Sequence, residues 1–181
     1  MQQDIIDQLH KWRESLNSKE ILCFENLPSI DLYMDQVVSI IEKLLSPYFN
    51  DTTKLITPSI INNYVKLNII PPPTKKKYSK EHIAKLIIIC VLKQVLSISS
   101  IKILMESHLK SMLISEFFNL FCKDLHETIC ATIGIRQIDS ATSPEKQINK
   151  MLLELSIKAG SNKLAADKIL TAYDRKAKQK K

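Results

Sequence analysis

The chain has 181 residues, with 26 lysines and arginines against 19 aspartates and glutamates, which gives a formal net charge of +7. Its 45% hydrophobic and 25% charged residues are typical of a globular protein, which excludes a disordered chain, and the length fits one domain or two small ones. The longest apolar run, Leu86 to Leu92, lies between two lysines and is far shorter than the roughly 20 residues that a membrane-spanning helix needs.

Two features of the sequence indicate the class of protein. Only two glycines and few alternating strand patterns predict an almost wholly helical chain, all-α apart from a wing that could be a small β hairpin. The amino end is polar and partly acidic, unlike the basic flank and apolar stretch of a secretory signal. We therefore expect an all-α protein in the cytoplasm, with no membrane partner.

Two amphipathic helices are predicted before residue 50. The first has an apolar stripe at helical spacing, formed by Ile5, Ile6, Leu9, Trp12 and Leu16. A linker through Pro28 joins it to a second helix, from about Asp31 to Leu45, with the same kind of pattern. Each is expected to pack one face on a core.

A short helix is predicted from Thr57 to Asn68. Thr57 is a suitable N-cap because its hydroxyl can accept from a free backbone N–H, and Pro58 falls where a missing N–H costs nothing. On a helical wheel one side is apolar, and an opposite arc of about 100° is polar and nearly uncharged. The polar arc holds Ser59, Asn62, Asn63 and Lys66, and the apolar side holds Ile60, Ile61, Tyr64, Val65 and Leu67.

The polar arc has the chemistry of a helix that enters a DNA major groove. Asparagine can bond N6 and N7 of adenine together, serine can donate or accept, and lysine can reach guanine or a phosphate. The alternative is a solvated helix face. Two consecutive asparagines lower helix propensity, which favours the recognition interpretation over an ordinary surface.

A lysine-rich arm follows this helix. Asn68 can adopt the left-handed conformation that ends a helix, and three prolines from Pro71 to Pro73 force an extended path. Three cations and an aromatic ring come next and form a candidate wing: Lys75, Lys76, Lys77 and Tyr78. Lysines so placed bind phosphates without reading sequence. The alternative is a solvated loop, because short lysine runs are common.

Two helices are predicted directly after the wing. Ser79 with Glu81 opens the first, and its middle, Ile87 to Leu92, is apolar all round, so it is the expected buried centre. The second runs from Ser97 to Leu109, with Ile98, Ile101, Leu104 and Met105 inward.

The last third of the chain shows packing patterns only. An apolar stripe ends at Gly134 and is formed by Ile114, Phe118, Phe121, Leu125, Ile129 and Ile133. A mobile stretch at residues 136–142 is expected next, and Ser143 with Pro144 caps a further helix. Gly160-Ser161 is expected to break that helix before a last one, which runs into a solvated, lysine-rich end.

Residues 56–101 resemble the DNA-binding domain of MerR-type winged-helix regulators. The matching features are an aromatic at the end of a helix, a Pro-Pro exit, a basic wing, a Tyr-Ser cap and a helix of spaced Leu and Ile. In this sequence they are, in the same order, Tyr64, Pro71-Pro72, the lysines ending at Lys76, Tyr78-Ser79, and the set Ile83, Leu86, Ile89 and Leu92. The resemblance implies a winged helix-turn-helix that binds DNA. With the wheel above it gives the expected DNA-binding set: Thr57, Ser59, Asn62, Asn63, Tyr64, Lys66, Lys75, Lys76, Lys77 and Tyr78.

A closer resemblance is to a family of small uncharacterised bacterial proteins with a domain of unknown function. It covers about Leu27 to Leu109 and rests on four short segments, which are Leu32–Val37, Ile61–Lys66, the triple proline with Lys76-Lys77-Tyr78, and Leu92–Val95. It implies a MerR-like, regulatory DNA-binding protein. The chain departs from the MerR pattern at Asn62 and Asn68, where that pattern has arginine and glycine.

Charge is concentrated on the same segment. Residues 51–110 carry ten basic and three acidic groups, a net of +7, whereas residues 1–50 carry −4, residues 111–172 are neutral and residues 173–181 carry +4. A basic segment of this kind is typical of a polyanion binder.

No catalytic or metal pattern is found. Cys122, His126 and Cys130 follow at steps of four on a helix, but a rise of about 1.5 Å per residue puts the two thiols about 12 Å apart, too far for one tetrahedral ion. Cys122 is expected in the core. No phosphate-binding glycine loop or nucleophile motif appears, so we expect no enzyme, no cofactor and no metal.

These patterns together predict a transcription regulator that binds double-stranded DNA. Residues 1–110 are expected to form a MerR-like winged-helix domain with an N-terminal helical extension, and residues 111–181 a helical dimerisation or effector body with a basic tail. The MerR resemblance implies a homodimer on a near-palindromic site, and the effector would be an unidentified small molecule or protein. The alternative is a protein-interaction adaptor that keeps the winged-helix shape without binding DNA.

Overall fold

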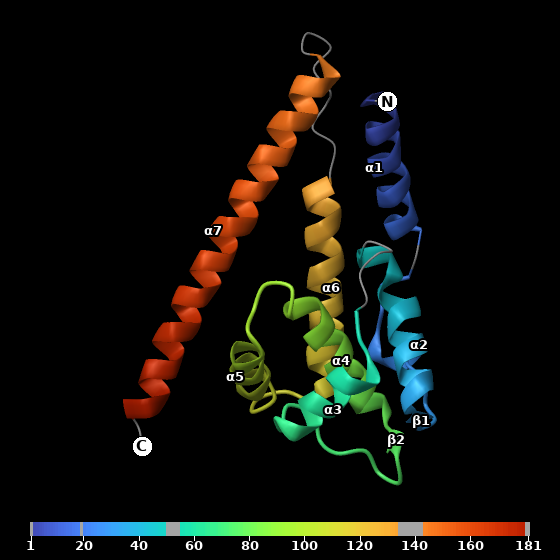
Figure 1. Cartoon of the computed structure of the whole chain (residues 1–181), viewed down its shortest axis with the longest axis vertical. Coiled ribbons are helices and arrows are strands. Elements are labelled where there is room, and N and C mark those ends of the chain that lie inside the picture. The colour runs from blue at the N-terminus through green and yellow to red at the C-terminus, as the bar shows by residue number, and fades with distance from the viewer. Residues whose placement is uncertain (1, 19, 50–54, 134–142, 180–181) are drawn as a thin grey trace. The chain divides into compact units, whose positions relative to one another are not determined.

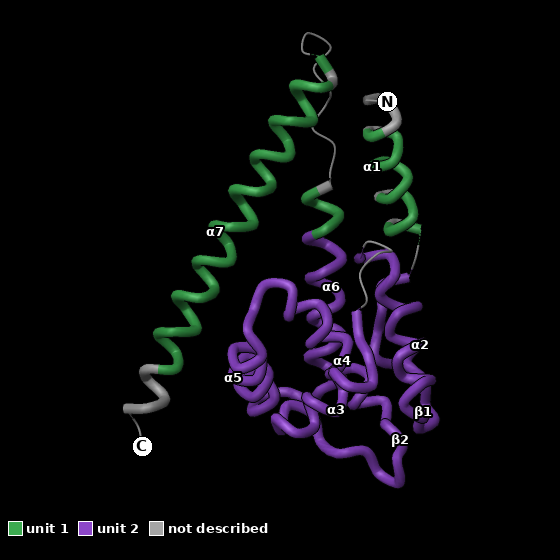
Figure 2. Tube along the Cα trace, viewed as in Figure 1, with its two compact units in different colours: residues 1–18, 129–181 green, residues 19–128 purple. Residues whose placement is uncertain are grey.

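The computed structural model describes residues 2–18, 20–49, 55–133 and 143–179 (Figure 1). This part of the chain is mostly helical and has one two-stranded sheet, so the predicted all-α class is confirmed. Contacts divide the chain into two compact units (Figure 2): residues 1–18 with 129–181 form unit 1, and residues 19–128 form unit 2. The functional boundary expected between residues 110 and 111 stays a prediction.

Unit 2 holds the segment with the candidate site. Its elements in chain order are η1 (Phe24–Asn26), β1 (Leu32–Tyr33), α2 (Met34–Leu45), η2 (Ser46–Tyr48), α3 (Pro58–Lys66), β2 (Lys77–Tyr78), α4 (Lys80–Leu92), α5 (Ile98–His108) and most of α6 (Ile114–Ile133). The second predicted helix starts later than Asp31 because Leu32 and Tyr33 form a strand.

Helix α4 is the buried centre of unit 2, as its sequence predicts. All side chains from Leu86 to Cys90 are buried, so the helix is covered on every side. Helix α2 contacts both α4 and α3, and its inner face is formed by Val37, Ile41 and Leu45, none of which is exposed. Removing this apolar surface from water is the main term that stabilises the unit.

The two-stranded sheet joins the wing to a segment that lies far before it in the sequence, and the tight turn between Thr74 and Lys77 is the small hairpin that the sequence allows. Strands β1 and β2 pair antiparallel, with Leu32 opposite Tyr78 and Tyr33 opposite Lys77. A two-residue turn precedes β2, and its ends, Thr74 and Lys77, exchange backbone hydrogen bonds of 3.0 and 2.9 Å. Because successive side chains alternate between faces, Leu32 and Tyr78 lie on the core side, and Tyr33 and Lys77 lie on the other.

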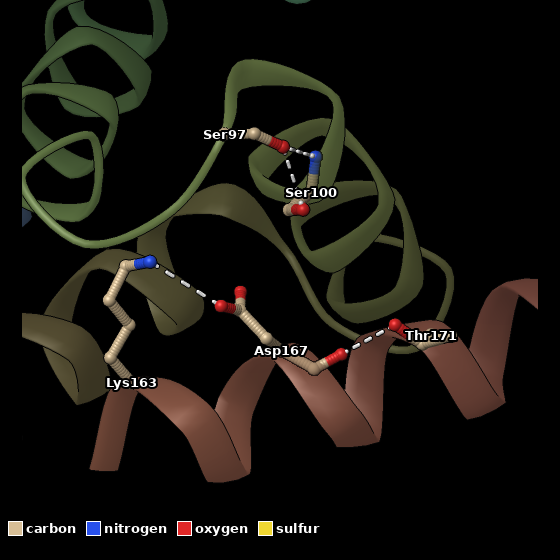
Figure 3. Close-up of polar contacts among 5 residues, drawn as sticks. All are labelled: Ser97, Ser100, Lys163, Asp167 and Thr171. Atoms are coloured by element: carbon tan, nitrogen blue, oxygen red, sulfur yellow. Dashed lines mark hydrogen bonds and ion pairs between the residues drawn. The ribbon is translucent and has the colours of Figure 1, made fainter. Parts of the chain in front are cut away.

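Helices α5 and α6 complete the unit. Ser97 is the N-cap of α5, since its Oγ accepts from the backbone N–H of Ser100 at 3.1 Å (Figure 3). Ile101 and Met105 are buried, as are Phe117, Phe118 and Cys122 of α6. The expected end of α6 at Gly134 and the stretch expected to be mobile, residues 136–142, lie outside the described residues.

Unit 1 contains α1 (Gln2–Asn17), the end of α6 and α7 (Pro144–Gln179), and α1 contacts α7. The predicted break at Gly160-Ser161 is wrong, because α7 is continuous through it. A Cβ at Gly160 would meet nothing within 4 Å, so the glycine makes no close contact and lowers local helix stability by about 1 kcal/mol relative to alanine without ending the helix. Nearby, Lys163 and Asp167 pair at 3.5 Å (Figure 3).

Candidate nucleic-acid interface

Helix α3 begins as its sequence predicts. Thr57 has an extended backbone, and its Oγ1 accepts from the backbone N–H of Ile60 at 3.2 Å, while Pro58 occupies the first helical position. The threonine hydroxyl is thus committed to the cap as an acceptor, and its own hydrogen remains able to donate. Helix α3 ends at Lys66. It is about one turn shorter than the predicted range from Thr57 to Asn68, because it loses residues at both ends.

The outer face of α3 is polar and exposed. Ser59, Asn62, Asn63 and Lys66 are all exposed, whereas Ile61 and Tyr64 on the opposite side are buried. None of the four polar side chains has a hydrogen bond or ion pair with another described residue. The helix therefore presents two amides, a hydroxyl and an ammonium group without intramolecular partners.

The carboxyl end of α3 is held by two devices. Asn68 has a φ of 53°, the left-handed conformation predicted for it, and Ile70 re-enters the core. From α5, the Lys102 ammonium donates to the Leu67 carbonyl oxygen at 3.2 Å. Lys102 is thus a structural cation, although it belongs to the basic segment.

The tip of the wing is a tight turn made of lysines. Lys75 and Lys76 occupy its two central positions with φ of 49° and 65°, the left-handed values of the type I′ hairpin class. Asparagine and glycine are the residues that usually adopt this conformation, so two lysines carry a strain of about 1 kcal/mol each. Both are exposed, and neither pairs with another described residue.

Lys77, the third wing lysine, differs from the first two. It is partly buried, and its Nζ lies 5.0 Å from the centre of the Tyr33 ring on the neighbouring strand. This geometry is a cation–π contact. Tyr33 itself is 55% exposed, and it could not be predicted as part of the interface because a two-residue strand leaves no alternating pattern that would place it beside the wing.

The two tyrosines expected to face DNA lie in the core. Tyr64 is 3% exposed and Tyr78 is 2% exposed, and burial raises the pKa of Tyr64 to about 12 and also raises the pKa of Tyr78. The wheel had placed Tyr64 on the apolar side of its helix, and only the MerR pattern put it in the expected set, whereas Tyr78 was expected there as the aromatic ring of the wing. Both tyrosines are therefore core residues that pack behind the candidate interface and are not part of its surface.

The base of the wing is tied to α4 by His82. Its Nδ1 accepts from the backbone N–H of Ser79 at 3.1 Å, and its Nε2 lies 3.2 Å from the Pro71 carbonyl oxygen. The ring also meets Tyr78 edge to face, with centroids 5.5 Å apart. The capping partner of Ser79 is thus His82 and not the neighbouring Glu81.

A scan against family models places this region in a known family. The DUF1836 model, described as a domain of unknown function, matches residues 22–125. The chain belongs to the DUF1836 family. Searches of the curated proteins and of the solved structures gave no match.

The DUF1836 match covers nearly all of unit 2, from before η1 to within α6. It includes α3, the wing and Tyr33, so the candidate interface belongs to the domain and not to a flanking extension. The expected resemblance to an uncharacterised family is thereby confirmed, and the match extends beyond the range of residues 27–109 on which it was based.

The cysteines do not form a competing site within the described chain. Cys90 and Cys122 are buried, and desolvation raises the pKa of each thiol to about 12, so both stay protonated and serve as core residues. No group of three metal-binding side chains occurs among the described residues. No described helix is both long and apolar enough to cross a bilayer.

Proposed function

We propose that this chain binds double-stranded DNA sequence-specifically through α3 and the wing. Ser59, Asn62, Asn63 and Lys66 face the bases of a major groove, and the wing lysines hold the flanking phosphates. Thr57, at the start of α3, would donate its hydroxyl hydrogen to the phosphate backbone of the DNA. The observation that carries the proposal is the row of exposed polar side chains on α3 that have no partner within the described chain.

Electrostatics supports this assignment. Residues 51–110 carry a net charge of +7, and Lys66, Lys75 and Lys76 are exposed and unpaired within the described residues, so their charge is available to an anion. Nine Cα–Cα steps join Lys66, at the end of α3, to Lys75 in the wing turn, which limits their separation to about 30 Å. Helix α3 and the wing lie at the same end of unit 2 (Figure 1).

The proposed role is that of a MerR-like transcription regulator acting in the bacterial cytoplasm. The resemblance of residues 56–101 to MerR-type domains supports a homodimer on a near-palindromic site. Residues 111–181 would then serve dimerisation or the sensing of an effector.

Salt dependence tests the proposal directly. Affinity for a random-sequence duplex should fall steeply with salt, with a slope in log K against log salt of about −0.9 for each phosphate contact. Replacing Lys75, Lys76 and Lys77 together by alanine should weaken binding to every duplex and make that slope shallower by about 2 to 3. The measurement is fluorescence anisotropy at several salt concentrations with the full chain.

Lys93→Ala is the matched control. It removes one exposed charge from the same unit, but α4 places it about 20 Å along the helix axis from the wing. Its affinity and slope should stay close to those of the unmodified chain. A change of affinity and slope in Lys93→Ala about one third as large as in the triple variant would mean that net charge alone drives binding, and would contradict the wing assignment.

The role of α3 needs a separate test, because lysines carry no sequence information. Selection of bound fragments from random duplexes should return a preferred site, and Asn62→Ala or Asn63→Ala should relax the preference at one base pair by about 1 to 3 kcal/mol. The affinity of these variants for random duplexes should change little. An unmodified chain with no salt-dependent duplex binding would refute the function and leave the adaptor alternative.

A further inference from the structure

Tyr33 occupies a position where its backbone is fixed and its ring is free. It precedes α2 directly, and its backbone N–H donates to Gln36 Oε1 at 2.9 Å, which closes the first turn of that helix. Pairing with Lys77 in the sheet fixes it from the other side. More than half of the side chain nevertheless lies in solvent, so the fold uses the Tyr33 backbone and leaves its ring outside.

The ring also sets where the Lys77 ammonium lies. In this cross-strand pair, Nζ lies 5.0 Å from the ring centre, whereas the ammonium groups of Lys75 and Lys76 have no such contact within the described chain. A lysine held against an aromatic face loses less side-chain freedom when it meets an anion. Lys77 is thus a positioned cation at the base of the wing, beside two free cations at its tip.

The Tyr33 hydroxyl has no hydrogen-bond partner among the described residues. A phenol donates well to a charged oxygen, and a hydrogen bond to an ionised group is stronger than one between neutral groups. The exposed hydroxyl and the positioned ammonium belong to one cross-strand pair. Together they offer a neutral donor and a cation on one surface, which is the chemistry that a non-bridging phosphate oxygen requires.

We propose that Tyr33 and Lys77 form a phosphate-binding pair that contacts the nucleic-acid backbone beside the tip lysines. The proposal rests on the DNA-binding function above and adds Tyr33 to the interface. The alternative for an exposed aromatic ring is stacking on an unpaired base. The contact of Lys77 with the ring and the unpartnered hydroxyl favour the phosphate.

The test measures binding of the full chain to a random-sequence duplex over a range of salt. Tyr33→Phe keeps the ring and the Lys77 contact but removes the hydroxyl, so affinity should fall about threefold to tenfold with an unchanged salt slope, because no charge is lost. Lys77→Met should weaken binding and also make the slope shallower by about 0.9. Ile30→Ala, which removes a 70% exposed apolar side chain three residues before Tyr33, is the control and should bind normally.

The outcomes separate this proposal from the function on which it rests. If the unmodified chain shows no salt-dependent binding to duplex DNA, the function fails and this pair fails with it. If the unmodified chain binds and Tyr33→Phe binds equally well at every salt concentration, only the pair is overturned. Normal binding by Tyr33→Phe together with a loss in Tyr33→Ala would show that the ring acts only by positioning Lys77, and would remove the hydroxyl from the proposed phosphate contact. Thermal unfolding by circular dichroism confirms that each variant is folded.

Discussion

Helices α3 and α4 belong to the same unit and are used in opposite ways. Helix α4 has no side open to solvent between Leu86 and Cys90, and even its histidine, His82, is buried and hydrogen-bonded. Helix α3 buries Ile61 and Tyr64 and leaves its whole polar arc without partners. Helix α4 therefore stabilises the fold and α3 presents a surface for binding, so stability and binding should respond to different substitutions.

The largest effect on folding is expected in α4. Ile87→Ala removes a side chain that is 0% exposed, and the lost burial and the resulting cavity should lower the free energy of unfolding by about 2 to 5 kcal/mol. Chemical denaturation measures this change. Asn62→Ala on the exposed face of α3 should alter the same quantity by only about 0.5 kcal/mol. Comparable losses in the two variants would break the contrast between the helices.

The wing turn should show binding and stability moving in opposite directions. Lys75→Asn with Lys76→Gly supplies the residues that a type I′ turn prefers, and relief of the strain should raise the free energy of unfolding by about 1 to 2 kcal/mol. The same double variant should bind duplex DNA more weakly because two phosphate contacts are lost. Lower stability than the unmodified chain, measured by thermal denaturation, would show that the two lysines are not strained.

A smaller effect is expected at the start of α3. Thr57→Ala removes the acceptor of the Ile60 N–H and should lower the free energy of unfolding by about 1 kcal/mol. Thr57→Ser keeps the hydroxyl and should restore most of the loss. Equal stability of the alanine and serine variants in urea titrations would mean that the cap does not contribute.

The smallest expected effect is a dependence on pH. Burial lowers the pKa of His82 below its ordinary value of 6.5, so the folded chain holds that proton more weakly than the unfolded chain. The contribution of His82 to stability should be complete above pH 6.5 and decline as the pH falls below it, because the unfolded chain is protonated first. Chemical denaturation at several values between about pH 5 and pH 8 measures this dependence. That range brackets the ordinary histidine pKa of about 6.5.

His82→Gln is the control for that dependence. Glutamine keeps an acceptor at the third helical position, where it can complete a capping box with Ser79, but it does not titrate. The part of the pH dependence due to His82 should therefore vanish in this variant. An unchanged pH profile would assign the dependence to other groups.

Local rules predicted much of this structure, and their failures have physical causes. The Thr57 cap, the turn at Asn68 and the polar arc of α3 depend on neighbours within four residues, so the sequence alone revealed them. The burial of Tyr78 depends on strand register, which two-residue strands do not signal. Helix α7 runs through Gly160 because the penalty of one glycine is small beside the propensity of a long helix.

The division of the lysines could not be predicted either. In the sequence, Lys77 and Lys102 look like any other lysines of the basic segment. In the structure, Lys77 contacts the Tyr33 ring and Lys102 donates to the Leu67 carbonyl oxygen. Lys77 lies 44 positions after Tyr33, and Lys102 lies 35 positions after Leu67. Periodicity and composition carry no information at such separations, so the sequence located the candidate surface without showing which cations are available on it.

The Lys102 contact has a consequence for how α3 meets any ligand. Thr57 caps one end of α3 and the Lys102 ammonium bonds to the other, so the helix is formed before it meets a ligand and should lose little backbone conformational entropy on binding. Recognition by such a preorganised rod should proceed as rigid docking, with only side-chain rotamers adjusting, and not as folding coupled to association.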